Sequence, residues 1–120
     1  MISTLYLSYD GMTDPLGQSQ VLPYLKKIAI NKEIHIISCE KPLNFRKHRT
    51  KIDNIIEGSN IHWHPLQYHK FPPILSTLWD LWRIKKLAVK LNKDLEFKLI
   101  HCRSHLMAIL GAALQISINI

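Results

Sequence analysis

The chain alternates short apolar runs that are typical of strands with longer segments in which apolar residues recur at helical spacing. The strand-like runs cover residues 5–9, 33–39, 61–68 and 98–102. Helical periodicity fills the intervals between them. A helix that joins two strands of one sheet normally makes them parallel, with a right-handed crossover. The sequence therefore predicts an α/β fold in which helices flank a parallel sheet.

Each expected helix carries an apolar stripe that predicts its buried face. The helix over 43–57 has a basic outer face and stops at Gly58, and its apolar side holds Phe45, Ile52, Ile55 and Ile56. In the helix over 74–93 the expected core stripe is Ile74, Leu78, Leu81, Ile84, Ala88 and Leu91. In the last helix, over 104–115, it is Leu106, Ile109, Leu110, Ala113 and Leu114.

A polar, glycine-bearing loop joins the first strand to the helix whose apolar residues begin at Val21. Ser19 is the expected helix cap, and Pro23 then falls near the first turn, where proline is tolerated. Gly17 would let a ligand approach the backbone, and unpaired N–H groups at the helix start would attract phosphate or carboxylate. The loop predicts an anion site, although a loop of this kind can also be a plain connection.

Two segments resemble one known family. Residues 8–20 read Ser-Tyr-Asp-Gly-Met-Thr-Asp-Pro-Leu-Gly-Gln-Ser-Gln, which resembles the amino-terminal segment of bacterial family 4 glycosyltransferases. Residues 100–104, Ile-His-Cys-Arg-Ser, are similar to the His-x-Arg-Ser that often ends the fourth strand in the same subgroup. Because the order of elements between them also fits, the likeness covers essentially the whole chain.

The resemblance implies a GT-B architecture, in which two Rossmann-like halves face each other across a cleft. With 120 residues there is room for one domain. Residues 1–120 would be the acceptor-side, amino-terminal half, incomplete at the carboxy end. The full enzyme would transfer a sugar from a nucleotide-sugar to a lipid-linked or glycan acceptor in cell-envelope polysaccharide biosynthesis. No cofactor is expected beyond the nucleotide-sugar co-substrate.

The missing carboxy-terminal half would supply most donor contacts, so catalytic residues are not assigned and this chain alone is not expected to transfer sugar. Substrate contacts are assigned to Asp14, Gly17, Gln18, Ser19, Arg103 and Ser104. The last two follow a parallel strand, at the sheet edge where α/β proteins bind ligands. Alternatively, Arg103 is a surface ion and Ser104 only a helix cap. A general-base role for Asp10 or Asp14 is a guess.

The charge distribution suggests a second partner. Lys and Arg number 16 against 9 Asp and Glu, a formal net charge of +7 that favours an anionic surface. The outward face of the helix over 74–93 carries Trp79 and Trp82, followed by Lys86, Lys90 and Lys93. Such a face suits a lipid headgroup boundary. Alternatively, the tryptophans pack under the 72–73 loop and the lysines are merely solvated.

A rival function follows from this face: a noncatalytic basic α/β module that binds an anionic membrane surface. For nucleic acid the charge is the only indication, so no nucleic-acid partner is expected. The sequence shows neither a spanning segment nor a signal peptide, which predicts a cytoplasmic protein, either free or peripheral on the inner face of the plasma membrane.

Cysteines and histidines predict no further site. Cys39 and Cys102 each end an expected strand and read as reduced, buried thiols. His62 and His64 point the same way on a strand, and His101 and His105 flank Cys102. A metal needs three or four converging ligands, and no acidic residue stands at an obvious ligand spacing beside either pair. No metal site is predicted.

Overall fold

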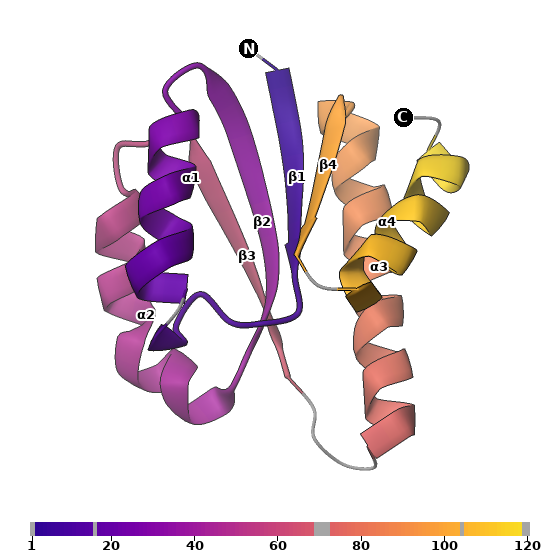
Figure 1. Cartoon of the computed structure of the whole chain (residues 1–120), viewed down its shortest axis with the longest axis horizontal. Coiled ribbons are helices and arrows are strands. Elements are labelled where there is room, and N and C mark those ends of the chain that lie inside the picture. Colours follow the sequence, from indigo (N-terminus) through magenta and orange to yellow (C-terminus); the bar gives the residue numbers. More distant parts are fainter. Residues whose placement is uncertain (1, 16, 69–72, 104, 119–120) are drawn as a thin grey trace.

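A computed structural model describes residues 2–15, 17–68, 73–103 and 105–118 of the chain. Strands and helices alternate through it (Figure 1). In chain order the elements are β1 (Ile2–Ser8), the π-helical turn η1 (Gly17–Val21), α1 (Leu22–Ile28), β2 (Lys32–Glu40), α2 (Pro42–Ile56), β3 (Ile61–Gln67), α3 (Pro73–Leu95), β4 (Leu99–Arg103) and α4 (His105–Ile118).

The four strands form one all-parallel sheet in the order β3-β2-β1-β4. Helices α1 and α2 cover one face and α3 and α4 the other, so the domain has three layers (Figure 1). The predicted α/β fold with a parallel, Rossmann-like sheet is confirmed. From β1 the chain builds outward to β3, then crosses back through α3 to place β4 on the opposite side of β1. The direction of winding therefore reverses between β1 and β4.

Each face of the sheet has its own apolar core. The core under α3 and α4 contains Leu5, Leu7, Ile37, Cys39, Ile84, Ala88, Phe97, Met107, Leu110 and Leu114. The core under α1 and α2 contains Tyr6, Met12, Val21, Leu22, Leu25, Ala29, Ile34, Ile36, Ile52 and Ile61. Successive strand residues alternate between the two cores, as expected for a sheet that is covered on both sides.

The buried face of α3 differs from the predicted stripe. Ile84 and Ala88 are buried as expected, but Leu78 is 58% exposed and its place in the core is taken by Ser76 and Asp80. Asp80 accepts a hydrogen bond of 3.2 Å from the hydroxyl of Tyr9. A carboxylate can be buried when a donor satisfies it. The bond from Tyr9 therefore allows the first half of α3 to face the sheet with Ser76 and Asp80, while the more apolar side of the helix faces outward.

The last helix also departs from its predicted stripe. Leu110 and Leu114 are buried as expected, whereas Ile109 is 70% exposed and Met107 is fully buried. Leu106 belongs to the predicted set but its side chain lies outside the described residues. The helix α4 is apolar on most of its surface, so hydrophobic periodicity alone does not define which side faces the sheet.

The helix after β1 starts earlier than predicted, and Ser19 is not its cap. Helical hydrogen bonding begins with the amide of Gln18, which donates to the carbonyl of Asp14 at 3.1 Å. The hydroxyl of Ser19 donates to the carbonyl of Pro15 at 2.8 Å, inside the helical turn. Pro23 does lie in the first turn of α1. Gly58 ends α2 with a φ of +77°, the conformation that glycine adopts without strain.

Candidate functional site at the carboxyl edge of the sheet

A cavity of about 330 Å³ opens where β1 and β4 end. Its walls come from Ser8 at the end of β1, from the loop and turn that follow, from Lys41 and Asn44 after β2, and from Arg103 at the end of β4. The strand register pairs Ser8 with Arg103. Open α/β sheets bind ligands outside the carboxyl ends of their strands at the point where winding reverses, which is the position of this cavity.

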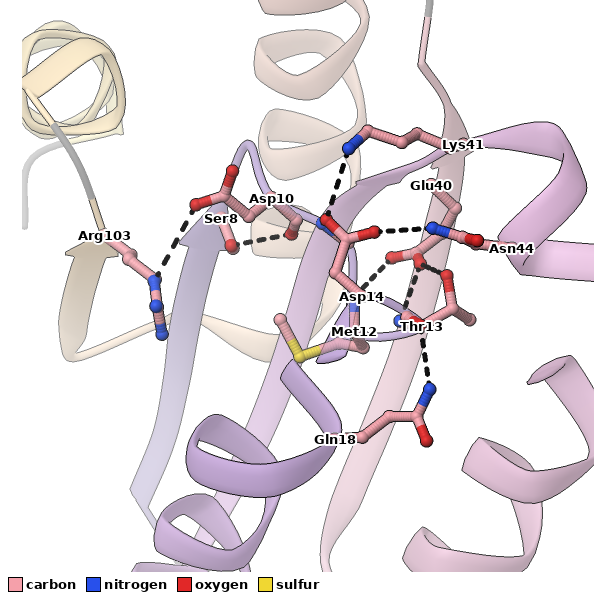
Figure 2. A network of polar contacts seen from close by, with 11 residues as sticks. Ser8, Asp10, Met12, Thr13, Asp14, Gln18, Glu40, Lys41, Asn44 and Arg103 are labelled. Carbon is pink, nitrogen blue, oxygen red and sulfur yellow. Dashed lines mark hydrogen bonds and ion pairs between the residues drawn. The ribbon is translucent and has the colours of Figure 1, made fainter. Parts of the chain in front are cut away.

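The loop at the cavity is closed around a carboxylate of the chain itself (Figure 2). Glu40, at the end of β2, is 2% exposed. It accepts hydrogen bonds from the amides of Met12 and Thr13 at 2.9 and 3.0 Å and from the Thr13 hydroxyl at 2.7 Å. Ser38 donates to the same carboxylate. The sequence predicts an anion site from free N–H groups at the helix start, but the amide of Gln18 donates to the Asp14 carbonyl and the loop amides of Met12 and Thr13 donate to Glu40.

Asp14 holds the loop against the start of α2. Its carboxylate accepts from the side-chain amide of Asn44 at 2.9 Å and from the Gly11 amide at 3.3 Å, and Lys41 Nζ lies 3.9 Å away (Figure 2). Asp14 lines the cavity. The groups that surround its carboxylate fix the loop to the start of α2.

Gly17 also lines the cavity, but its lack of a side chain serves the packing of the loop. A Cβ at this position would lie 2.6 Å from the carbonyl oxygen of Gly11 and 2.7 Å from the Cα of Met12. Both atoms belong to backbone, which cannot move aside cheaply. Gly17 therefore allows the helical turn to pack closely against the loop that precedes it.

The other predicted contacts have different positions. Gln18 donates its side-chain amide to the carbonyl of Thr13 at 2.8 Å, and Ser19 bonds Pro15. Neither residue is among those that line the cavity. Ser104 lies outside the described residues. Of the six predicted substrate contacts, Asp14, Gly17 and Arg103 are thus brought together at the cavity.

Arg103 is held at the cavity by neighbours from β1 and the loop. Its Nε lies 3.9 Å from Asp10 Oδ2, a carboxylate that is itself 70% exposed (Figure 2). Burial raises the pKa of the Tyr6 hydroxyl, and a hydrogen bond with the Arg103 side chain opposes part of that rise. Because the ion pair with Asp10 is long and exposed to solvent, it is weak. An anionic ligand can therefore compete with Asp10 for the guanidinium.

Lys41 and Asn44 are cavity residues that were missed by reasoning from the sequence. Lys41 follows the second strand directly and Asn44 lies in the first turn of α2, at the carboxyl edge that parallel strands share. That placement was the signal available in the sequence. With Lys41 and Arg103 the cavity has two cationic side chains on opposite sides, together with the carboxylates of Asp10 and Asp14.

The outward face of α3 is exposed as predicted. Trp79 and Trp82 are 53% and 51% exposed, next to the exposed Leu75 and Leu78. Lys86 Nζ lies 5.1 Å from the centre of the Trp82 ring. Further along, a groove runs over the lysine-rich half of the helix, lined by Trp82, Lys85, Lys86, Val89, Lys90 and Lys93. Among the helices that the structure describes, none is long and apolar enough to cross a membrane.

The prediction for the cysteines is confirmed in part, and one prediction for the histidines is wrong. Cys39 and Cys102 are both free thiols, but Cys39 is buried whereas Cys102 is only half-buried. The strands that carry them, β2 and β4, are separated by β1. The prediction that no acidic residue accompanies His62 is wrong. Glu33 Oε1 lies 3.4 Å from His62 Nε2 and 2.8 Å from His35 Nε2, because the register of β2 and β3 pairs His35 with His62.

Comparisons of this chain with protein-family models, with curated proteins and with solved structures give no match. Its resemblance to the glycosyltransferases therefore rests on the two segments named above and on the fold.

Proposed function

We propose that the chain is the acceptor-side, amino-terminal domain of a family 4-like GT-B glycosyltransferase. One observation carries the proposal: residues from the two family-like segments, 8–20 and 100–104, line the same cavity although more than 80 positions separate them in the chain. That cavity lies at the reversal point of a parallel sheet, where α/β proteins place ligands.

In this proposal Arg103 and Lys41 bind an anionic group of the acceptor, such as the phosphate of a lipid-linked acceptor. Both are cations at the cavity wall, and a guanidinium can bind phosphate with two parallel hydrogen bonds. Asp14 and Glu40 act indirectly, by holding the loop in the shape that forms the wall. The proposal requires a second Rossmann half to bind the nucleotide-sugar co-substrate, and transfer would depend on positioning and on stabilising the departing nucleoside diphosphate.

The test is isothermal titration of the chain with a water-soluble isoprenyl phosphate and with UDP- and GDP-sugars. Arg103→Gln and Lys41→Gln should each weaken isoprenyl phosphate binding roughly tenfold, the effect of losing one charge-assisted hydrogen bond. Lys26→Gln is the matched control, because it removes the same charge from an exposed site on α1 away from the cavity. Equal binding by Arg103→Gln and Lys26→Gln, or no binding by the native chain, would refute the proposed role of the cavity.

A second candidate function is favoured by the outward face of α3. Four large apolar side chains lie exposed along one helix, Leu75, Leu78, Trp79 and Trp82, and lysines follow them. We propose that this face lies on an anionic membrane surface, with the tryptophans at the headgroup level and Lys86, Lys90 and Lys93 toward the phosphates. In a glycosyltransferase, this contact would hold the enzyme peripherally on the cytoplasmic side of the plasma membrane. Alternatively, membrane binding would itself be the function, and the chain would be a noncatalytic module.

Vesicle sedimentation separates these possibilities. Vesicles with anionic lipid should retain the native chain more than zwitterionic vesicles, and Trp79→Ser with Trp82→Ser should abolish most of the difference. A triple Lys→Gln variant at 86, 90 and 93 should lower binding roughly a hundredfold, since each cation near the surface contributes about 1 kcal/mol. A variant with Lys26→Gln, Lys27→Gln and Lys51→Gln controls for net charge, because it removes the same three charges from exposed positions on α1 and α2. Vesicle binding without any response to isoprenyl phosphate or nucleotide-sugars would favour the noncatalytic module.

A further inference from the structure

Three side chains converge at the end of the sheet opposite the cavity. Glu33 and His35 come from the start of β2 and His62 from the start of β3. Their ligand atoms, a carboxylate oxygen and one nitrogen of each imidazole, all lie within 4.8 Å of one another. The strands place these three side chains on the face that α3 and α4 cover, where Phe97 packs edge-on against the His35 ring.

The separations suit a metal ion without large movement. Tetrahedral coordination at 2.0 to 2.1 Å puts ligand atoms about 3.3 Å apart. Glu33 Oε1 lies 2.8 Å from His35 Nε2 and 3.4 Å from His62 Nε2, on either side of that value. The third edge, between the two imidazoles, is no longer than 4.8 Å. Two nitrogens and one carboxylate oxygen form a donor set that zinc commonly takes, with a fourth position for water.

A fourth side chain, that of His64, contacts the ring nitrogen of His35 that faces away from Glu33. Its Nε2 lies 3.0 Å from the Nδ1 of His35. With a metal on His35 Nε2, the proton of that ring must sit on Nδ1, and His64 Nε2 is placed to accept it. Metal-binding imidazoles regularly donate their second nitrogen in this manner, which fixes both the tautomer and the ring orientation.

We propose that Glu33, His35 and His62 bind one divalent transition-metal ion of the zinc class, with His64 as the hydrogen-bond partner of His35. The ion joins the start of edge strand β3 to that of β2. Binding requires His62 to tilt, because its ring now stacks on His35 at 4.5 Å with an interplanar angle of 17°. The His62 side chain is 52% exposed on the edge strand, so the tilt meets little packing.

The experiment uses the tag-free chain with zinc chloride by isothermal titration, and with cobalt chloride by visible absorption. We expect saturable binding of one Zn²⁺ per chain, tetrahedral Co²⁺ bands, and a rise in melting temperature that EDTA reverses. His62→Gln and Glu33→Gln should each weaken Zn²⁺ binding at least tenfold. His64→Phe should weaken it roughly tenfold while the cobalt bands persist, as expected for a partner outside the coordination sphere.

His48→Gln is the matched control, because it removes one imidazole from α2 on the other face of the sheet. Circular dichroism and urea unfolding without metal establish that each variant is folded before its affinity is compared. Two results would overturn the proposal: no saturable binding of Zn²⁺ at micromolar concentration by the native chain, or undiminished binding by His62→Gln and Glu33→Gln.

Discussion

The two ends of strand β2 each carry a glutamate, and the two side chains have opposite surroundings. Glu40 at the carboxyl end is 2% exposed and accepts from two amides and two hydroxyls of its own chain. The side chain of Glu33 at the start is 28% exposed and pairs with the imidazoles of His35 and His62. Glu40 is thus enclosed by backbone and hydroxyl donors. Glu33 is paired with two histidine side chains.

The two carboxylates therefore have different roles. Glu40 stabilises the fold, whereas Glu33 can bind a ligand. The donors to Glu40 include two backbone amides, those of Met12 and Thr13, so removal of the carboxylate leaves buried N–H groups without their acceptor. The imidazole of His62 is 52% exposed and can turn toward water or a cation. The carboxyl end of β2, where the loop encloses Glu40, is the closed end, and it shapes the cavity. The start of β2, with Glu33, is the open end, and its carboxylate remains available to bind a ligand.

The largest expected effect concerns the reactivity of Cys39, the neighbour of Glu40. Burial, reinforced by the charges of Asp80 and Glu40, raises the pKa of Cys39 to about 12. The thiolate is the reactive form and is lost as the pKa rises, so at pH 8 its fraction is roughly a thousandfold below that of an ordinary thiol. In a Cys102→Ser variant, labelling by DTNB should require unfolding. Rapid labelling of this variant while it is folded would show that the carboxyl end of β2 is open.

Removal of the two glutamates should give unequal losses of stability. Glu40→Ala leaves the Met12 and Thr13 amides buried without an acceptor and should lower the free energy of unfolding by about 3 kcal/mol. Glu33→Ala should cost less than about 1 kcal/mol, because its ion pairs are partly solvated. Urea unfolding at neutral pH, in the presence of EDTA, measures both. Equal losses would remove the distinction between the two ends.

A methyl group at Gly17 tests how rigid the closed end is. Gly17→Ala should cost about 2 kcal/mol, since its Cβ would collide with the backbone of Gly11 and Met12. Gly58→Ala is the matched control, because it meets no atom within 4 Å and has only its positive φ to oppose it. That variant should cost about 1 kcal/mol. If Gly17→Ala were the milder of the two in urea unfolding, the loop would be adaptable.

The smallest effect should come from one donor to Glu40. Thr13→Val removes the hydroxyl that donates to Glu40 at 2.7 Å and should lower the free energy of unfolding by about 1.5 kcal/mol. Thr50→Val, on the exposed side of α2, should change it by less than about 0.5 kcal/mol. Indistinguishable unfolding midpoints for the two variants would mean that water or another group replaces the Thr13 hydroxyl.

Local patterns were sufficient for most of the fold. Alternation of apolar residues predicted the four strands to within a few positions, and Gly58 predicted the end of α2. The stripe of α3 was predicted correctly at Ile84 and Ala88 and wrongly at Leu78. In that first half a polar contact, from Tyr9 to Asp80, accompanies the change of buried face, and a pattern of hydrophobicity cannot anticipate it.

For the candidate site, the sequence predicted the edge of the sheet but not its chemistry. It indicated that residues near Asp14, Gly17 and Arg103 meet where parallel strands end, and these three do line one cavity. It could not indicate that the amides beside them are filled by Glu40, a residue 27 positions from Thr13 in the chain. Which anion a loop binds depends on what its neighbours already offer.

By itself the sequence determined the alternating elements, the parallel sheet and the family-like loop, because period and turn chemistry are local properties of the chain. Only the tertiary structure decided the strand order, the burial of Glu40 in the loop, and the meeting of Glu33 with His35 and His62. These depend on register and on competition among distant donors and acceptors, which is settled when the strands pair and the helices pack on them.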